Sequence, residues 1–276
     1  MDQSLTEKYL AGCHDANAGV TSRSFAHLPA TSGIRSFVST YRALIATLPE
    51  LGPPLTMLDL ACGDGHMLSL LANLPAPHTL LGIDLSDGEL AAAHARLGDR
   101  AILCRCKAQQ LPLASASVDA VLSHLALMLM HDADELIAEV RRVMRPGGTF
   151  VGLVGALSPP NAALDAFIRL YPGDSRQPVY AGIRFGDRRF GSEDGIRTLL
   201  VPGFDILTFD ELSLSRDYTP AEAWNWLRHL YDTDLLRTDA LEVFRRECLQ
   251  ALQSLCEQSG TLCYEDRWLR FSASVR

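Results

Sequence analysis

The stretch LDLACGDGH, residues 58–66, decides the fold. An apolar run over residues 55–61 has the pattern of a strand, and a run that begins at His66 has the apolar spacing of a helix. Gly63 and Gly65 stand between them and let the backbone turn tightly and approach a ligand closely. Because the first turn of a helix presents unpaired N–H groups, we predict that this turn binds a ligand.

Strand-like and helix-like runs alternate after this turn. Helical runs begin at His66, Ser86 and Asp132, and further strand-like runs cover residues 78–85, 101–106, 118–127 and 148–155. Such alternation is typical of a parallel sheet covered by helices on both faces. Two later runs, residues 204–215 and 268–275, also have strand character. We therefore predict an α/β fold whose sheet has seven strands, mostly parallel.

The segments outside this alternation are expected to be mainly helical. In the first fifty residues, the run 36–48 places apolar side chains on one face at helical spacing. We expect an N-terminal helical cap over residues 1–54 and a ligand-binding domain over residues 55–276. Helical lid insertions within that domain are expected at about 156–203 and 216–265.

Asp84, in GIDLS, ends the strand that follows the glycine turn. An acidic residue at this place can accept hydrogen bonds from both ribose hydroxyls of an adenosine ligand. An aspartate before a helix is, by itself, more often an N-cap. Together with Gly63 and Gly65, however, Asp84 favours the ligand-binding interpretation.

Composition and charge narrow the class of partner. The 276 residues carry a formal net charge of −8, which repels a phosphate backbone, so we expect a small-molecule substrate and no nucleic acid. No segment has the apolar length of a membrane span, and the N-terminus lacks a secretory signal pattern. We expect a cytoplasmic monomer or homodimer. The seven cysteines contain no CxxC pair, so we predict neither a disulfide framework nor a metal site.

Four blocks in this order resemble the class I S-adenosylmethionine (SAM)-dependent methyltransferases, especially the branch that includes ubiquinone and menaquinone biosynthesis enzymes. The blocks are LDLACGDG, GIDLS, AQQLPLASASVDAV and RRVMRPGGTF, and they lie within residues 56–155. The resemblance implies a Rossmann-like sheet and SAM as co-substrate. A dinucleotide site fits less well because the turn lacks the G-x-G-x-x-G pattern.

The resemblance also implies which residues surround SAM. Asp59, Ala61, Gly63 and Gly65 are expected around its methionine part, Asp84 at the ribose and Leu85 beside the adenine. The family often has an acidic residue near the adenine amino group, but this chain has Lys107, which cannot accept a hydrogen bond. The substitutes that we expect there are the Ala108 backbone and the Gln109 amide. Ser123 is expected to complete the SAM site.

The acceptor side is expected at the end of the strand that contains Ser123. The resemblance places His124 where family members face the transferred methyl group, although a structural histidine is an equally good interpretation. Tyr9 and Tyr171 are our candidates for aromatic rings that stabilise the sulfonium. His124 or Tyr171 is the candidate base that removes a proton from the acceptor.

Three functions remain open on the sequence. The first is methyl transfer from SAM to a small-molecule acceptor, in secondary metabolism by expectation. The second is a SAM cyclase, as in some offshoots similar to this family, which turns SAM alone into azetidine-2-carboxylate and methylthioadenosine. The third is a non-catalytic SAM-binding protein.

Overall fold

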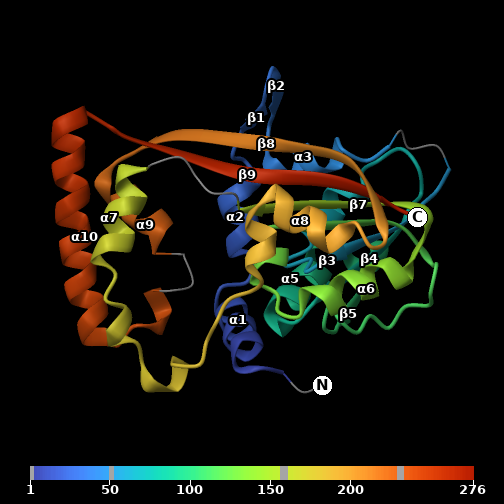
Figure 1. Cartoon of the computed structure of the whole chain (residues 1–276), viewed down its shortest axis with the longest axis horizontal. Helices are drawn as coiled ribbons and strands as arrows, with labels where there is room; N and C mark the ends of the chain where they lie inside the picture. The colour runs from blue at the N-terminus through green and yellow to red at the C-terminus, as the bar shows by residue number, and fades with distance from the viewer. Residues whose placement is uncertain (1–2, 50–52, 156–160, 229–232) are drawn as a thin grey trace. The chain divides into compact units, whose positions relative to one another are not determined.

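The structure is a computed structural model that describes residues 3–49, 53–155, 161–228 and 233–276 (Figure 1). The chain forms two compact units. The first comprises Met1–Leu157, Phe185–Ser213 and Arg267–Arg276, and the second comprises Ser158–Arg184 and Leu214–Asp266. The expected division at residue 54 and the two expected lids stay predictions.

The described residues contain a nine-stranded sheet in the order β2-β1-β8-β9-β7-β6-β3-β4-β5. Its central strands β7, β6, β3, β4 and β5 run parallel to their neighbours in this group, whereas β9 runs antiparallel to β7. This mixed sheet confirms the predicted Rossmann-like α/β fold. The strands are β1 (Ala30–Ser32), β2 (Arg35–Phe37), β3 (Thr56–Leu60), β4 (Thr79–Asp84), β5 (Ile102–Arg105), β6 (Val118–His124), β7 (Met144–Gly155), β8 (Phe204–Tyr218) and β9 (Leu262–Val275).

The strand count exceeds the prediction because the N-terminal segment contributes the hairpin β1–β2. The turn between these strands contains Gly33, whose φ of 55° lies in the left-handed region that glycine adopts readily. The expectation that the first fifty residues are helical is therefore wrong for this part. The expected helix over residues 36–48 is shorter, because the Ser39 side chain accepts a hydrogen bond from the Arg42 amide and caps a helix that begins at Thr40.

Helices pack on both faces of the sheet. Against one face lie α6 and α8, whose apolar side chains share a buried core with Leu58, Val121 and Phe150 of the central strands. The helices of the first unit are α1 (Leu5–Ala16), α2 (Val20–Phe25), α3 (Thr40–Ile45), α4 (His66–Leu71), α5 (Asp87–Leu97), α6 (Ala133–Val143) and α8 (Glu193–Leu200). Its short 3-10 helices are η1 (Gly98–Arg100), η2 (Leu127–Leu129) and η5 (Arg188–Gly191).

Strand register brings three predicted site residues to the opposite face. Asp59 is level with Leu122 on β6 and with Gly82 on β4. Since side chains alternate along a strand, the residues two positions further on, His124 and Asp84, share the face of Asp59. The carboxyl ends of these parallel strands meet at one edge, where ligands bind in open α/β sheets.

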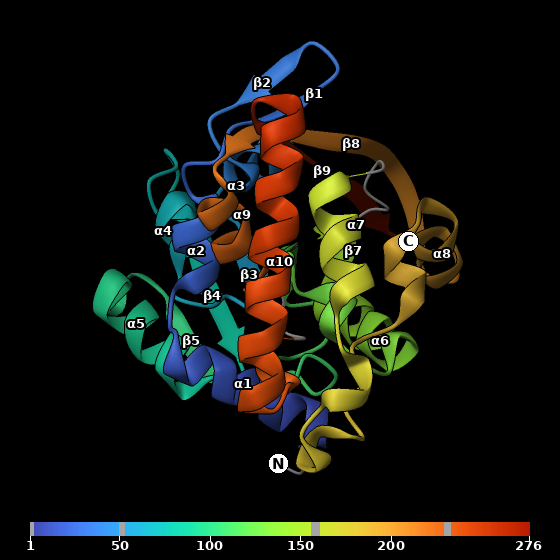
Figure 2. The same ribbon diagram turned by 90° about the vertical axis from the view of Figure 1, so that its left-hand side faces the viewer.

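The second unit is a small helical cluster with its own core. Helices α7, α9 and α10 lie side by side in both ribbon views (Figure 2), and Phe167, Trp224, Phe244 and Cys248 are among the buried residues between them. These helices are α7 (Ala162–Leu170), α9 (Pro220–Leu227) and α10 (Thr238–Ser259), and the unit's 3-10 helices are η3 (Gly173–Ser175), η4 (Pro178–Tyr180) and η6 (Thr233–Leu235). No helix within the described ranges has both the length and the apolar character that a membrane crossing requires.

Candidate active site at the glycine turn

The turn after β3 has three residues in the left-handed backbone region. The φ angles are 63° at Ala61, 51° at Gly63 and 73° at Gly65. A Cβ on Gly65 would lie only 2.8 Å from the Leu97 side chain, whereas on Gly63 its nearest neighbour would be a Glu89 oxygen at 3.8 Å. Gly65 is thus required for packing against α5, and Gly63 leaves space beside the backbone. That space is what a ligand needs in order to approach the main chain.

Asp84 is bound to the glycine turn directly. Its Oδ2 accepts a hydrogen bond from the Gly63 amide at 2.9 Å, and its Oδ1 accepts one from the Ser86 amide at 2.9 Å. Burial raises the pKa of the Asp84 carboxyl despite these two bonds. The N-cap of α5 is Ser86, whose side chain accepts from the Glu89 amide. Asp84 is therefore not the cap of this helix.

Asp59 is a buried carboxyl group without a full set of partners. Its exposed fraction is 1 %, and its Oδ2 has no hydrogen-bond partner among the described residues. Burial, together with the nearby Asp84 and Asp64, raises the pKa of Asp59 to about 8. Such an unpaired buried oxygen is costly unless a donor or a cation satisfies it.

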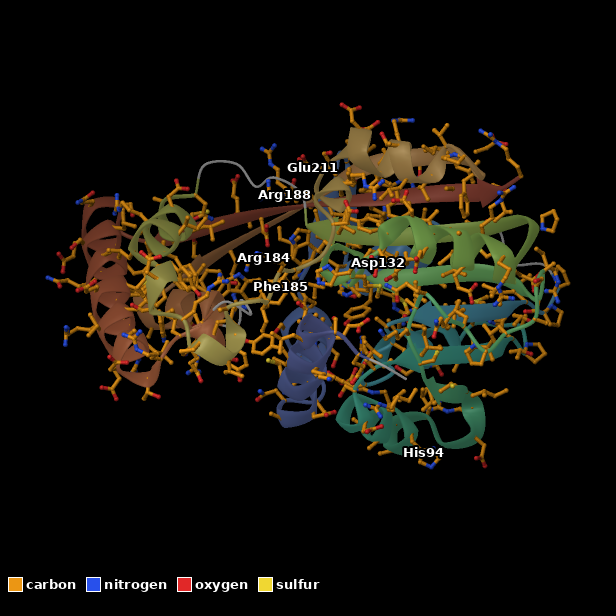
Figure 3. The ribbon with its side chains drawn as sticks, turned by 60° about the horizontal axis from the view of Figure 1, so that its bottom comes forward. His94, Asp132, Arg184, Phe185, Arg188 and Glu211 are labelled. Atoms are coloured by element: carbon orange, nitrogen blue, oxygen red, sulfur yellow. The ribbon has the colours of Figure 1, made fainter. Side chains whose placement is uncertain are left out.

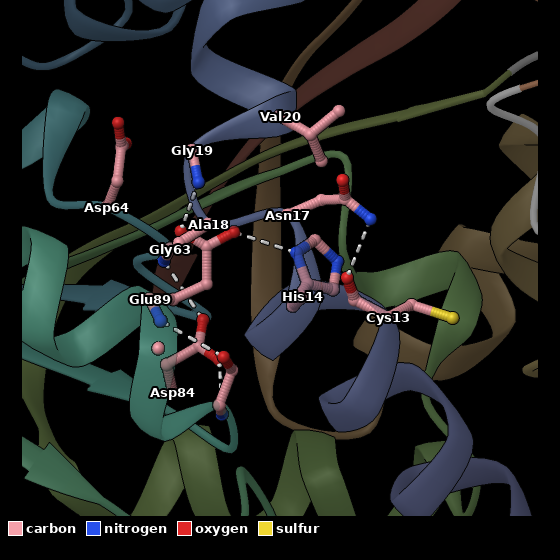
Figure 4. A network of polar contacts seen from close by, with 12 residues as sticks. Cys13, His14, Asn17, Ala18, Gly19, Val20, Gly63, Asp64, Asp84 and Glu89 are labelled. Carbon is pink, nitrogen blue, oxygen red and sulfur yellow. Dashed lines mark hydrogen bonds and ion pairs between the residues drawn. The ribbon is translucent and has the colours of Figure 1, made fainter.

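The N-terminal segment supplies a set of contacts to the start of α5, beside this turn, that the sequence did not predict. Glu89 accepts a hydrogen bond from the Gly19 amide at 2.8 Å, and His14 Nδ1 lies 2.8 Å from its other oxygen (Figure 4). Asp15 accepts from the Ser86 hydroxyl at 2.6 Å and from the Gly88 amide at 2.8 Å. Carboxylates at distant positions in the sequence gave no local signal for these pairings.

Asp64, inside the glycine turn, joins the same network. It accepts a hydrogen bond from the Ser22 hydroxyl of α2 at 2.5 Å and pairs with Arg96 of α5. The Arg96 guanidinium also donates to the Asp64 carbonyl at 2.9 Å. Helices α2 and α5 therefore both contact a single aspartate of the turn.

Lys107 has a partner that accounts for the departure from the family pattern. Its Nζ lies 2.8 Å from Glu7 Oε2 of α1, and both side chains are largely buried. The pair attaches α1 to the loop where the sequence predicts adenine contacts. In that loop Ala108 is buried, and the Gln109 amide donates to the His131 carbonyl at 2.7 Å. The adenine role of both residues stays a prediction, as does that of Leu85, whose carbonyl accepts from Arg105 at 2.9 Å.

His124 lies in a buried aromatic cluster. Its ring stacks on Tyr41 at a centroid distance of 3.7 Å, and its Nε2 lies 2.9 Å from the Thr40 hydroxyl. Complete burial lowers the pKa of His124 to about 3, so the ring is neutral at physiological pH. Its Nδ1 has no hydrogen-bond partner among the described residues. The neighbouring Ser123 hydroxyl donates to the Leu60 carbonyl at 3.0 Å inside the sheet.

The two aromatic candidates belong to different units. Tyr9 of α1 is buried in the first unit, with its ring centroid 6.2 Å from that of Phe185, which Figure 3 labels. Tyr171 belongs to the second unit, where its hydroxyl accepts from Arg176 at 3.3 Å and its ring meets Phe244 edge-on. The predicted roles of Tyr9 and Tyr171 beside a sulfonium stay predictions.

With this geometry in place, comparison with known proteins identifies the central segment. Residues 58–152 match the methyltransferase domain family. Malonyl-[acyl-carrier protein] O-methyltransferases of Methylococcus capsulatus and Hahella chejuensis are 38 % and 33 % identical to this chain over 109 and 108 residues. These alignments cover 38 % and 39 % of this chain and 40 % and 39 % of the relatives, so the chain spans less than half the length of these curated relatives.

Solved structures share the fold at low sequence identity. The YcgJ protein of Bacillus subtilis has a TM-score of 0.57 and 15 % identity, and the match covers 85 % of this chain and 97 % of that one. Geranyl diphosphate C-methyltransferase of Streptomyces coelicolor, solved with S-adenosylhomocysteine, has a TM-score of 0.52 and 16 % identity over 86 % of this chain and 77 % of that one. Residues 58–152 thus match a methyltransferase domain in sequence, which supports a SAM-dependent transferase, and the solved structures share its fold.

Metal-ligand geometry is not found in the described part of the chain. No group of three or more His, Cys, Asp or Glu side chains there is arranged to hold a metal ion.

Proposed function

We propose that this protein transfers the methyl group of SAM to a small-molecule acceptor. The observation that carries the proposal is the juxtaposition of an open glycine turn, the carboxyl of Asp84 bonded to that turn, and the unpaired buried oxygen of Asp59. Ribose hydroxyls and an ammonium group are the parts of SAM that such carboxyls recognise.

Asp84 and Asp59 divide the recognition of SAM between them in this proposal. Each Asp84 oxygen already accepts one amide bond and keeps a further lone pair for a ribose hydroxyl. Asp59 is buried beside Asp84 and Asp64, so a cation there lowers the repulsion among the three carboxyls. Ala61, Gly63 and Gly65 hold the turn in the backbone conformation that brings these groups together.

Little further chemistry is required of the protein. SAM, when bound, supplies a methyl group on a positively charged sulfur that leaves readily. The protein's part is to position the acceptor in line and to exclude water. His124, with a pKa of about 3, is a weak proton acceptor at neutral pH. His124 is therefore better suited to an acceptor that needs only a hydrogen bond or a packing contact. It is less suited to an acceptor that must lose a proton.

The acceptor class is inferred from charge and from the relatives. A net charge of −8 repels nucleic acid. Two matched relatives are named malonyl-[acyl-carrier protein] O-methyltransferase, and one structural neighbour is named geranyl diphosphate C-methyltransferase. Small organic acids and isoprenoid-type compounds are therefore the acceptors to test first.

The test follows the labelled methyl group of SAM by mass spectrometry. The protein, and an Asp84→Asn variant as control, are incubated with methyl-labelled SAM in the presence and absence of a panel of small acids, alcohols, amines and isoprenoid diphosphates. Label in an acceptor together with S-adenosylhomocysteine supports the proposal. Methylthioadenosine with azetidine-2-carboxylate from SAM alone establishes the cyclase instead. SAM binding without either product, across the panel, favours a non-catalytic SAM-binding protein.

A further inference from the structure

Residues 14–22 connect the N-terminal helices to the glycine turn after β3 and to the start of α5. Glu89 receives two hydrogen bonds from this segment, one from His14 and one from the Gly19 amide. Asp15 accepts from two groups at the start of α5, and Ser22 donates to Asp64 in the glycine turn. Figure 4 shows His14 and Gly19 converging on Glu89 next to Gly63 and Asp84.

Glu89 is the centre of this connection because of its burial. Its side chain is 1 % exposed, and Asp84 lies close enough to oppose its charge. The nearest neighbour of a Cβ on Gly63 would be the Glu89 Oε2 at 3.8 Å, so the carboxyl lies beside the open part of the turn. A buried carboxylate that loses its donors either takes up a proton or moves to water. Either change disturbs the turn.

Two features favour glycine at position 19, a positive φ and the lack of space for a Cβ. Its φ is 77°, and a Cβ there would lie 2.9 Å from Asp64 Oδ2 and 3.0 Å from Arg23. A side chain at this position therefore displaces either the Asp64 carboxyl, which Ser22 and Arg96 hold, or the N-terminal segment itself. Gly33, at the tip of the β1–β2 hairpin, has a φ of 55° and no atom within 4 Å of the same position. It is a matched control for backbone strain without the clash.

The groups that face His14 come from three elements. Glu89 on α5 holds its Nδ1, Asp84 at the end of β4 lies nearby, and Asp15 is its neighbour on α1. Burial opposes protonation, but these carboxyls prevail and raise the pKa of His14. The surrounding carboxyls therefore favour the protonated form of the His14 ring.

We propose that Glu89 is a positioning residue that fastens residues 14–22 against the glycine turn, and that this attachment sets the affinity of the site for SAM. The inference rests on the proposed SAM site but concerns groups outside the predicted SAM contacts. Glu89 acts through His14 and Gly19, which arrange the turn and its cover. SAM binding and docking of α1 are then thermodynamically coupled, so that each strengthens the other.

The first test exploits the geometry of the His14 donor. In His14→Asn the side-chain amide nitrogen is two bonds from Cβ, as Nδ1 of histidine is, so it can donate to Glu89. In His14→Gln the amide nitrogen is three bonds from Cβ, as Nε2 of histidine is, and so it lies away from Glu89. Calorimetric titration of the full chain with SAM should give His14→Asn within about threefold of the wild-type affinity. His14→Ala and His14→Gln should bind SAM at least about tenfold more weakly, as expected when the buried Glu89 carboxylate loses a hydrogen-bond donor.

The second test uses the two glycines and a structural readout. Gly19→Ala should weaken SAM binding at least about tenfold and accelerate hydrogen exchange in α1, whereas Gly33→Ala should change neither, although both carry the strain of a positive φ. Addition of SAM to the wild-type protein should slow exchange in α1. Thermal unfolding of each variant shows whether the rest of the protein is still folded.

The outcomes separate this inference from the proposed function. Absence of SAM binding in the wild-type protein overturns the proposed function and, with it, the inference. SAM binding that is equal in all His14 variants and in Gly19→Ala overturns the inference alone. The same holds if His14→Asn and His14→Gln weaken SAM binding equally, because the atom that contacts Glu89 would then be immaterial.

Discussion

Asp84 at the end of β4 accepts a hydrogen bond from the amide of Gly63, which precedes it by 21 residues, at 2.9 Å. This bond joins the two motifs that the sequence picks out separately. The Asp84 carboxyl thereby holds the glycine turn, in addition to its proposed contact with the ribose. The parallel register of β3 and β4 places the two residues next to each other.

Replacing Asp59 with asparagine should stabilise the protein and weaken SAM binding. The pKa of Asp59 in the folded protein, about 8, lies above that of the unfolded chain, so the folded state holds an extra proton between these values. The free energy of unfolding therefore falls as pH rises from about 4 to about 8. The Asp59→Asn variant does not lose free energy of unfolding in this way. At about pH 8 its Tm should therefore exceed that of the wild type by at least about 2 °C, which corresponds to roughly 1 kcal/mol in a domain of this size.

Thermal unfolding at several pH values measures this effect, and the difference between Asp59→Asn and wild type should shrink as pH falls towards 4. A Tm that is lower in Asp59→Asn at every pH would show that the carboxylate is satisfied in the folded protein. Calorimetry in buffers of different ionisation enthalpy should also show that SAM releases a proton from the wild type and not from the variant.

Replacing Ala61 with glycine should stabilise the turn. Ala61 has a φ of 63°, a conformation that costs a residue with a Cβ about 1 kcal/mol relative to glycine. Ala61→Gly should therefore raise the free energy of unfolding by up to about 1 kcal/mol in denaturant titrations.

The matched control is Ala46→Gly, at a position with a right-handed helical φ of −66°. There glycine should destabilise by a few tenths to about 1 kcal/mol. Equal destabilisation by both substitutions would mean that Ala61 does not store backbone strain.

The ion pair between Glu7 and Lys107 should couple α1 to the loop after β5. Glu7→Gln and Lys107→Gln are each expected to destabilise, and a double-mutant cycle should give a coupling energy of about 0.5–1 kcal/mol, because both side chains are only partly screened by solvent. Charge reversal of both residues should restore part of the stability. Additive single effects would show that the 2.8 Å pair contributes nothing to docking of α1.

His124 should remain neutral well below physiological pH. Burial lowers the pKa of its ring to about 3, below the unfolded value, so the free energy of unfolding falls as pH drops below about 6.5. Nitrogen chemical shifts of the His124 ring should stay those of a neutral imidazole down to about pH 4. A ring that titrates between about pH 6 and 7 would restore His124 as a candidate general base.

The central strands and the glycine turn could be predicted from the sequence, because local patterns of apolar residues and glycines determine them. The apolar runs around residues 58–61 and 118–124 are strands because they are buried on both faces, and glycines at positions 63 and 65 allow the turn between β3 and α4. The place of Asp84 follows from the same alternation. Its bond to Gly63 requires only that neighbouring parallel strands end together.

The contacts from the N-terminal segment could not be predicted in this way. His14 and Glu89 are 75 residues apart, and neither belongs to a recognisable motif. The hairpin β1–β2 could not be predicted because each strand has only three residues, too few to show alternation. The partner of Lys107, Glu7, could not be predicted either, because an ion pair between distant elements leaves no pattern in the local sequence.

The most direct test of the account is a calorimetric titration of the full chain with SAM, for the wild type, Asp84→Asn and Asp119→Asn. Asp119 accepts the Thr56 amide at 2.8 Å and pairs with Arg145, so its variant loses a comparable carboxylate at the other end of the strands. The account predicts that wild type and Asp119→Asn bind SAM with similar affinity and that Asp84→Asn binds at least about tenfold more weakly. Wild-type protein that fails to bind SAM, or equal binding by all three proteins, would contradict it.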